Sequence, residues 1–152
     1  MLRSRLLQPD ILEALGRAGH ASKILIADRN YPRSIRLGPN AKLVSLNLSP
    51  GVVNGTQVLE ALLSAVPIEA ATIMEHDTEG PAGLADDPPI WDAYKRILAE
   101  NKVDVVLQKL DRPAFFEAAS DSAVVLTIAT AEQSPYANVL LQLGVFPADH
   151  QQ

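Results

Sequence analysis

Amphipathic stretches and short apolar runs alternate along the chain. Four stretches carry apolar residues at helical spacing, and they begin near Pro9, Asn54, Pro89 and Asp111. Short apolar runs between them predict strands at residues 24–27, 42–46, 70–74, 103–107, 123–129 and 139–145. This alternation predicts an α/β fold in which helices cover both faces of a mixed β-sheet. The order of the strands does not follow from the pattern.

Turn-forming and capping residues mark the ends of several elements. Pro9 suits the first turn of a helix, and Gly19 suits the left-handed residue that ends one. Either Asn54 or Thr56 could cap the second helix. The segment 75–89 is acidic and rich in Gly and Pro, so it predicts a surface loop whose length is typical of functional or mobile connections.

Composition and charge narrow the class of protein. The chain has 152 residues, of which 47% are hydrophobic and 20% charged, as expected for a single globular domain over residues 1–152. It contains no cysteine, which excludes disulfides, thiolate metal ligands and thiol catalysis. Its net charge of −5 and its dispersed Lys and Arg residues argue against a nucleic-acid partner. It lacks both the run of about 20 apolar residues that a membrane span needs and the pattern of a signal peptide, so we expect a cytoplasmic protein with no membrane partner.

Several signatures of nucleotide and hydrolase sites are absent from the sequence. The chain has no G-x-G-x-x-G sequence, no P-loop and no G-x-S-x-G sequence. Its three histidines, His20, His76 and His150, do not have the spacing of a helical zinc motif. We therefore expect neither a cofactor nor a metal ion.

Two titratable residues flank the first predicted strand. His20 precedes it, and Asp28 lies at its carboxyl end, where open α/β sheets often place ligand-binding groups. Each residue also has a plain structural role. His20 could donate to the last carbonyl groups of the preceding helix, and Asp28 could cap the turn that contains Asn30 and Pro32. For either residue alone, the structural role is the more common one.

Two further groups could bind a neutral ligand rich in hydroxyl groups. Tyr136 and Asn138, which flank Ala137 before the last predicted strand, can donate and accept hydrogen bonds to sugar hydroxyls. Arg112, at the start of the last predicted helix, can donate to a ligand oxygen. The alternatives are a Tyr136 ring packed on the edge of the core and a solvated Arg112. We expect His76 to be a solvated loop residue.

Taken in order, five segments of the chain resemble the bacterial ribose and fucose mutarotases. Each segment alone is weakly specific, but together they follow the family's order over nearly the whole chain. They are Gly-His at 19–20, the apolar strand with its Asp-x-Asn-Tyr-Pro sequence at 24–32, Pro-Ile-Trp at 89–91, Arg-Pro-Ala-Phe-Phe-Glu at 112–117 and Tyr-Ala-Asn at 136–138.

The resemblance implies a role for each matching residue. It places the catalytic proton donor at His20. It places sugar contacts at Asp28, Arg112, Tyr136 and Asn138, with a backbone contribution from Ala137. Because the ribose branch carries histidine where this chain has Arg112, the resemblance favours the fucose branch. Family members assemble as rings with sites near subunit boundaries, which implies a ring-shaped homo-oligomer, such as a decamer of two pentamers.

Mutarotation suits these residue types. The reaction opens a cyclic sugar and closes it again on the other face, so the ring oxygen must gain a proton and the anomeric hydroxyl must lose one. Histidine exchanges protons near neutral pH. We therefore predict a cofactor-independent isomerase that interconverts the anomers of a monosaccharide such as L-fucose or D-ribose, with His20 as general acid and base. Asp28 could contact a sugar hydroxyl, polarise the anomeric hydroxyl or orient His20, and we favour the first.

Two alternatives use the same residues differently. A non-catalytic, monosaccharide-binding accessory protein of a sugar transport or sensing system would keep Asp28, Arg112, Tyr136 and Asn138 without any proton transfer. A purely structural ring protein would bind no sugar. The sequence does not separate binding from catalysis, because one pocket serves both.

Overall fold

The computed structural model describes residues 1–81 and 83–148 of the chain. Its strands form one six-stranded sheet in the order β2-β5-β1-β6-β3-β4. The strands are β1 (Lys23–Ala27), β2 (Lys42–Ser45), β3 (Ile68–Met74), β4 (Leu107–Leu110), β5 (Val124–Ala129) and β6 (Val139–Leu143). The helices are α1 (Pro9–Arg17), α2 (Gly55–Leu63), α3 (Pro89–Glu100) and α4 (Arg112–Ala119). The predicted α/β class is confirmed.

The sheet is mixed because one strand runs against the others. β1 is parallel to β5, β5 to β2 and β3 to β4, whereas β6 is antiparallel to both β1 and β3. The carboxyl ends of five strands and the amino end of β6 therefore meet at the same edge of the sheet, which we call the carboxyl edge. The opposite edge, where β1 and β3 begin, is the amino edge. Loops at the carboxyl edge of such sheets commonly hold ligands.

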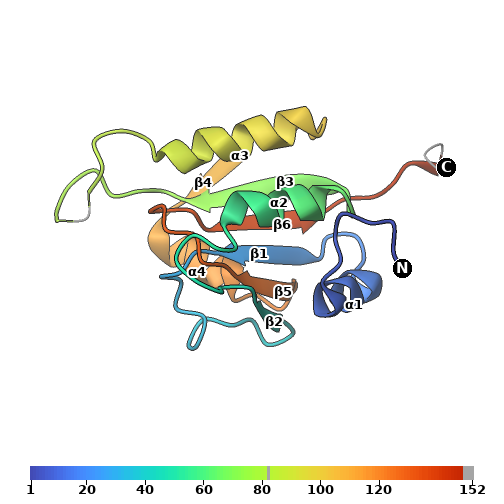
Figure 1. Ribbon diagram of the computed structural model, residues 1–152. Coiled ribbons are helices and arrows are strands. Elements are labelled where there is room, and N and C mark those ends of the chain that lie inside the picture. The colour runs from blue at the N-terminus through green and yellow to red at the C-terminus, as the bar shows by residue number, and fades with distance from the viewer. Residues whose placement is uncertain (82, 149–152) are drawn as a thin grey trace.

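Helices cover both faces of the sheet, as predicted (Figure 1). The apolar faces of α1, α2 and α3 pack on one side against Ile24 and Ile26 of β1, among others. Leu25 and Ala27 of the same strand point to the other side and pack against Phe115 of α4. This alternation is the period-two pattern of a strand buried on both faces. Among the described residues, no helix is long and apolar enough to cross a membrane.

Side-chain caps begin α2 and α4, and the cap predicted at Asn54 is confirmed. The Asn54 side chain accepts a hydrogen bond from the Gln57 N–H, and the Gln57 side chain accepts one from the Asn54 N–H, which forms a complete capping box. The Thr56 hydroxyl donates to Asn54 Oδ1, so it supports the cap without being the cap. Asp111 accepts from the Ala114 N–H at the start of α4.

Three sequence predictions about element ends are wrong. β4 covers Leu107–Leu110, whereas residues 103–107 had been predicted, because the Val103 N–H donates to Leu98 O and closes the end of α3. β6 ends at Leu143, and residue 145 lies beyond it, because the partner strands β1 and β3 begin opposite residues 142 and 143. α1 ends in extended backbone at Ala18, and the left-handed residue that follows is Ala21, with φ +66°, so Gly19 does not have this role.

Candidate functional site

A pocket of about 240 Å³ opens at the carboxyl edge of the sheet. Its lining includes four of the residues predicted from the sequence, Asp28, Arg112, Tyr136 and Asn138. They reach it from three segments: the turn after β1, the first turn of α4 and the connection that enters β6. A wider hollow beside α4, at Arg36 and Glu117, contains none of them. The carboxyl edge is therefore the candidate site.

Asp28 and Asn138 form a reciprocal pair at the base of this pocket. The Asp28 N–H donates to Asn138 Oδ1 at 2.8 Å, and Asn138 Nδ2 donates to Asp28 Oδ2 at 3.2 Å. Asp28 Oδ1 also accepts from the Asn30 N–H at 2.9 Å, so the predicted turn cap is present as well. Burial raises the pKa of Asp28, and this effect outweighs the backbone N–H groups of Asn30, Tyr31 and Ala137, which lower it. The carboxylate is thus a buried acceptor that gains from a ligand hydroxyl donor.

The connection 136–138 is held by two aromatic side chains of α3. Tyr136 has φ +54°, a left-handed conformation that is uncommon for a residue with a Cβ. Trp91 Nε1 donates to Tyr136 O at 2.9 Å, and the Tyr94 hydroxyl donates to Ala137 O at 2.7 Å. Trp91 and Tyr94 are both fully buried. Sequence reasoning missed these supports, although two aromatic residues with polar tips three positions apart on one helix are a visible signal.

Arg112 and Tyr136 meet at the rim of the pocket, together with a carboxylate that the sequence analysis did not select. Arg112 Nη2 lies 2.9 Å from Asp77 Oδ2 and 3.5 Å from the Tyr136 hydroxyl. The Asp77 N–H donates to the Tyr136 hydroxyl at 3.1 Å. The half-exposed Arg112 side chain is therefore paired and not freely solvated.

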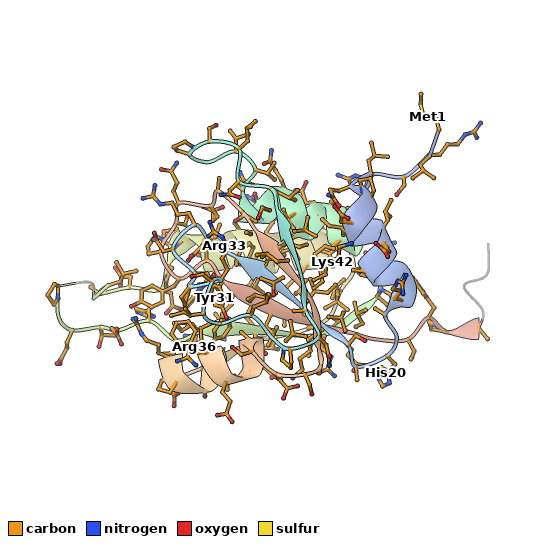
Figure 2. All side chains as sticks on the ribbon, turned by 90° about the horizontal axis from the view of Figure 1, so that it is seen from below. Met1, His20, Tyr31, Arg33, Arg36 and Lys42 are labelled. Atoms are coloured by element: carbon orange, nitrogen blue, oxygen red, sulfur yellow. The ribbon has the colours of Figure 1, made fainter. Side chains whose placement is uncertain are left out.

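His20 lies at the other edge of the sheet (Figure 2). Its Nε2 is 3.0 Å from both carboxylate oxygens of Glu69, and its side chain is 56% exposed. Five residues of β1 separate it from the turn of Asp28, and a strand of that length spans about 17 Å. Within one chain His20 therefore does not reach the pocket, and Asp28 does not orient it. His20 bonds Glu69, and therefore does not have the alternative role of donating to the last carbonyl groups of the preceding helix.

Glu69 completes a small polar cluster with His20 at the amino edge. Gln142 Nε2 donates to Glu69 Oε1 at 2.7 Å. The hydrogen bond from Gln142 lowers the pKa of Glu69 by more than burial raises it, and the hydrogen bond and charge of His20 lower it further. Glu69 is thus an ionised acceptor, so His20 Nε2 carries the proton of that bond, and within residues 1–81 and 83–148 Nδ1 has no hydrogen-bond partner.

The prediction for His76 is wrong. Its side chain is 8% exposed, and its ring packs edge-on against Trp91 and Tyr136 with centroid distances of 5.3 and 5.9 Å. The acidic, Gly-rich sequence around His76 is typical of a solvated loop, but the ring packs against Trp91 of α3 and against Tyr136. His150 lies outside the described residues.

The pocket brings together a carboxylate, an amide, a guanidinium and an aromatic ring, groups that can form hydrogen bonds and ring contacts with a polar ligand rich in hydroxyl groups. The chain belongs to the RbsD / FucU transport protein family, whose model matches residues 1–146. The family recognised from the sequence is therefore confirmed.

Relatives with assigned names span almost the whole chain. The fucose mutarotase of Mus musculus is 31% identical and covers 92% of this chain and 90% of its own length. The D-ribose pyranase of Paracidovorax citrulli is 30% identical and covers 95% of this chain and 98% of its own. Both names denote isomerases of the mutarotase type, the kind of enzyme predicted from the sequence.

Two solved structures share the fold over most of their length. The fucose mutarotase of Streptococcus pneumoniae, solved in complex with L-fucose, is 27% identical, with a TM-score of 0.76 over 92% of this chain and 94% of that one. The RbsD structure of Bacillus subtilis, complexed with D-ribose, has a TM-score of 0.77 over 97% of this chain and 100% of that one. At 22% identity the second likeness shows the fold alone.

Proposed function

We propose that this protein is a sugar mutarotase that interconverts the anomers of a monosaccharide such as L-fucose or D-ribose. One observation carries the proposal: this chain, which belongs to the family, has the Asp28–Asn138 pair and Arg112 in a single pocket at the carboxyl edge. The ring opening that exchanges anomers also allows exchange between pyranose and furanose forms. Arg112, together with the fucose mutarotase relatives, supports a fucose-type sugar.

The pocket offers complementary groups for a sugar. The Asp28 carboxylate accepts from one hydroxyl, and the free N–H groups of Arg112 donate to others. The Tyr136 ring supplies an apolar face for the sugar's C–H groups, and Asn138 fixes the position of Asp28. In this proposal these groups bind the sugar, and a separate group carries out the acid–base step.

His20 has the chemistry for that step. Glu69 holds its Nε2–H, which fixes the tautomer and leaves Nδ1 to take the proton of the anomeric hydroxyl and then, as part of the imidazolium, to give it to the ring oxygen. A carboxylate behind a histidine also stabilises the imidazolium that forms during the exchange. In this proposal His20 is the catalytic residue and Glu69 is the positioning residue.

We further propose that a neighbouring protomer supplies His20 to the pocket, in a ring-shaped homo-oligomer such as a decamer of two pentamers. The distance along β1 supports this arrangement, because a single chain holds His20 and Asp28 at opposite edges of the sheet. The exposure of His20 also supports it, since the side chain is free to enter a neighbour's pocket. Cyclic assembly naturally brings opposite edges of two copies together.

Saturation-transfer NMR on equilibrated sugars tests the reaction. We expect the protein to accelerate exchange between the anomeric proton signals of at least one of L-fucose, D-ribose and a panel of other pentoses and hexoses. His20→Ala, which changes an exposed side chain, should fold normally and lose most of the acceleration. Full activity of this variant would remove His20 from the mechanism.

Subunit mixing tests the shared site. His20→Ala and Asp28→Ala should each be inactive alone, whereas co-refolding them in equal amounts should restore about a quarter of the wild-type activity, because random assembly pairs intact residues at that fraction of boundaries. Mixing that restores nothing, with hetero-oligomers confirmed by mass spectrometry, would contradict a site shared between protomers.

The second candidate function is a non-catalytic sugar-binding accessory of a transport system. The family description as transport proteins favours it. It predicts that sugar binds with wild-type affinity to His20→Ala and that the wild type leaves anomer exchange at its uncatalysed rate.

A further inference from the structure

We propose that Asp77 is a positioning residue that sets sugar specificity, because it joins Arg112 and Tyr136 into one rigid unit at the rim of the pocket. The inference rests on the proposed function, since it concerns the same pocket. Asp77 follows β3 in the segment 75–88, and the sequence analysis assigned no role to it.

Asp77 bonds both side chains through different groups. Its Oδ2 accepts from Arg112 Nη2 at 2.9 Å and from the Tyr136 hydroxyl at 3.4 Å, while its backbone N–H donates to the same hydroxyl at 3.1 Å. Arg112 comes from the first turn of α4, and Tyr136 comes from the connection to β6. The two halves of the rim are therefore tied together by a third segment.

The pairing leaves Arg112 oriented but available. A guanidinium has five N–H donors in a planar fork, and one terminal nitrogen faces Asp77. The side chain of Arg112 is 50% exposed, so without a partner its long stem would populate many rotamers. With Asp77 in place, the remaining donors keep a fixed direction, and a sugar must place its oxygen atoms to match them.

The backbone beside Asp77 is itself anchored. The buried ring of the preceding residue, His76, packs against Trp91 and Tyr136. Trp91 in turn donates to the backbone carbonyl of Tyr136. Tyr136 is thus held at its backbone by α3 and at its hydroxyl by Asp77, and this arrangement is more rigid than a solvated loop would provide.

Sugar binding and anomer exchange, measured by NMR for the panel of sugars, test the role of Asp77. We expect Asp77→Ala to raise KM for the preferred sugar by about three- to tenfold, with kcat within about twofold of wild type. The ratio of kcat/KM between the preferred sugar and its epimers should fall. Asp77→Asn should be intermediate, because its amide oxygen still accepts from Arg112 without the charge. Asp86→Ala, the same change at an exposed position of the same loop, is the control and should match wild type.

A double-mutant cycle separates positioning from a direct contact. If Asp77 acts through Arg112 and Tyr136, Asp77→Ala should raise the KM of the Arg112→Ala variant by a smaller factor than it raises that of wild type, and the melting temperature should stay within about 2 °C of wild type because the pair is exposed. Unchanged KM and specificity in Asp77→Ala, or additive effects in the double variant, would overturn the inference. If the wild type binds sugar without accelerating exchange, only the proposed function is refuted, because dissociation constants still test the role of Asp77. If the wild type binds no sugar, the proposed function and the role of Asp77 are both overturned.

Discussion

Replacing Tyr94 by Phe tests whether α3 holds the carboxyl-edge pocket in place. The substitution removes one hydroxyl group and keeps the buried ring. That hydroxyl donates to Ala137 O at 2.7 Å, inside the turn that carries Tyr136 and Asn138. Burial raises the pKa of Tyr94, so the group is a neutral donor at every working pH. The variant therefore removes a hydrogen bond without changing a charge.

The magnitude follows from the burial of both partners. Tyr94 is fully buried and Ala137 is 1% exposed, so water does not replace the lost donor. A net hydrogen bond is worth about 1 kcal/mol, and a buried carbonyl left without its donor costs about 1–3 kcal/mol. We expect a loss of about 2 kcal/mol in the free energy of unfolding, which lowers the melting temperature by about 4–8 °C for a chain of this size.

Urea unfolding at a fixed protein concentration measures this loss, and the denaturant slope should not change. Tyr31→Phe is the matched control, because Tyr31 is also buried but donates to the carbonyl of the exposed residue Arg36, at 3.2 Å. Its loss should stay below about 1 kcal/mol, because water can replace the donor. Sugar affinity should fall in Tyr94→Phe, because the turn loses a support. Equal losses in the two variants, or a fully stable Tyr94→Phe with unchanged affinity, would refute the reasoning.

Two further predictions concern the contacts around Tyr94. A Cβ at Gly55 would collide with the Tyr94 hydroxyl, so Gly55→Ala should destabilise the wild type and should be tolerated in a Tyr94→Phe background, where the methyl group takes the vacated space. Additive free energies of unfolding in the four proteins of this cycle would contradict the collision. Burial raises the pKa of Glu132, but hydrogen bonds from the Ser134 and Gly55 N–H groups outweigh this and hold the pKa below its ordinary value of 4.5. Ionised Glu132 therefore stabilises the fold above that pH, so Glu132→Gln should cost about 1–2 kcal/mol at pH 7, and the difference from wild type should shrink as the pH falls through 4.5 and below. A difference that is constant from pH 7 to pH 3 in thermal unfolding would exclude this linkage.

The apolar pattern predicted the elements well where burial is strong. β1 is a continuous apolar run because α-helices cover both of its faces, and the sequence shows this directly. β4 was misplaced because it is an edge strand with exposed Gln108 and Lys109, while Val106, in the apolar run before it, is 82% exposed. Strand order was not predictable, because pairs such as Ile24 and Leu126 are set by packing between distant segments.

The candidate site was predictable to the extent that it lies on one edge of the sheet. Asp28 follows a buried strand, and Asn138 precedes one that runs the other way, so a mixed sheet places them together. The supports were not predictable in the same way. Asp77 lies in a Gly-rich acidic loop and Glu69 at the start of a strand, and both look like solvated residues until the fold brings Arg112 and His20 to them. A short-range sequence pattern predicts the helix, strand or loop that contains a residue, but not the distant residue that the fold brings into contact with it.

The position of His20 in the fold bears on how a site containing both His20 and Asp28 could be assembled. A histidine and an aspartate eight positions apart look like neighbours in the sequence, but the intervening strand, which is about 17 Å long, holds them at opposite edges of the sheet. If both act on one sugar, they must come from different protomers, and the activity then depends on assembly. The Glu69 carboxylate is consistent with this, because it orients His20 on the amino edge without help from the pocket it would serve. A histidine prepared in one chain and used in the next accounts for the absence of a histidine from the described lining of the pocket in a single chain.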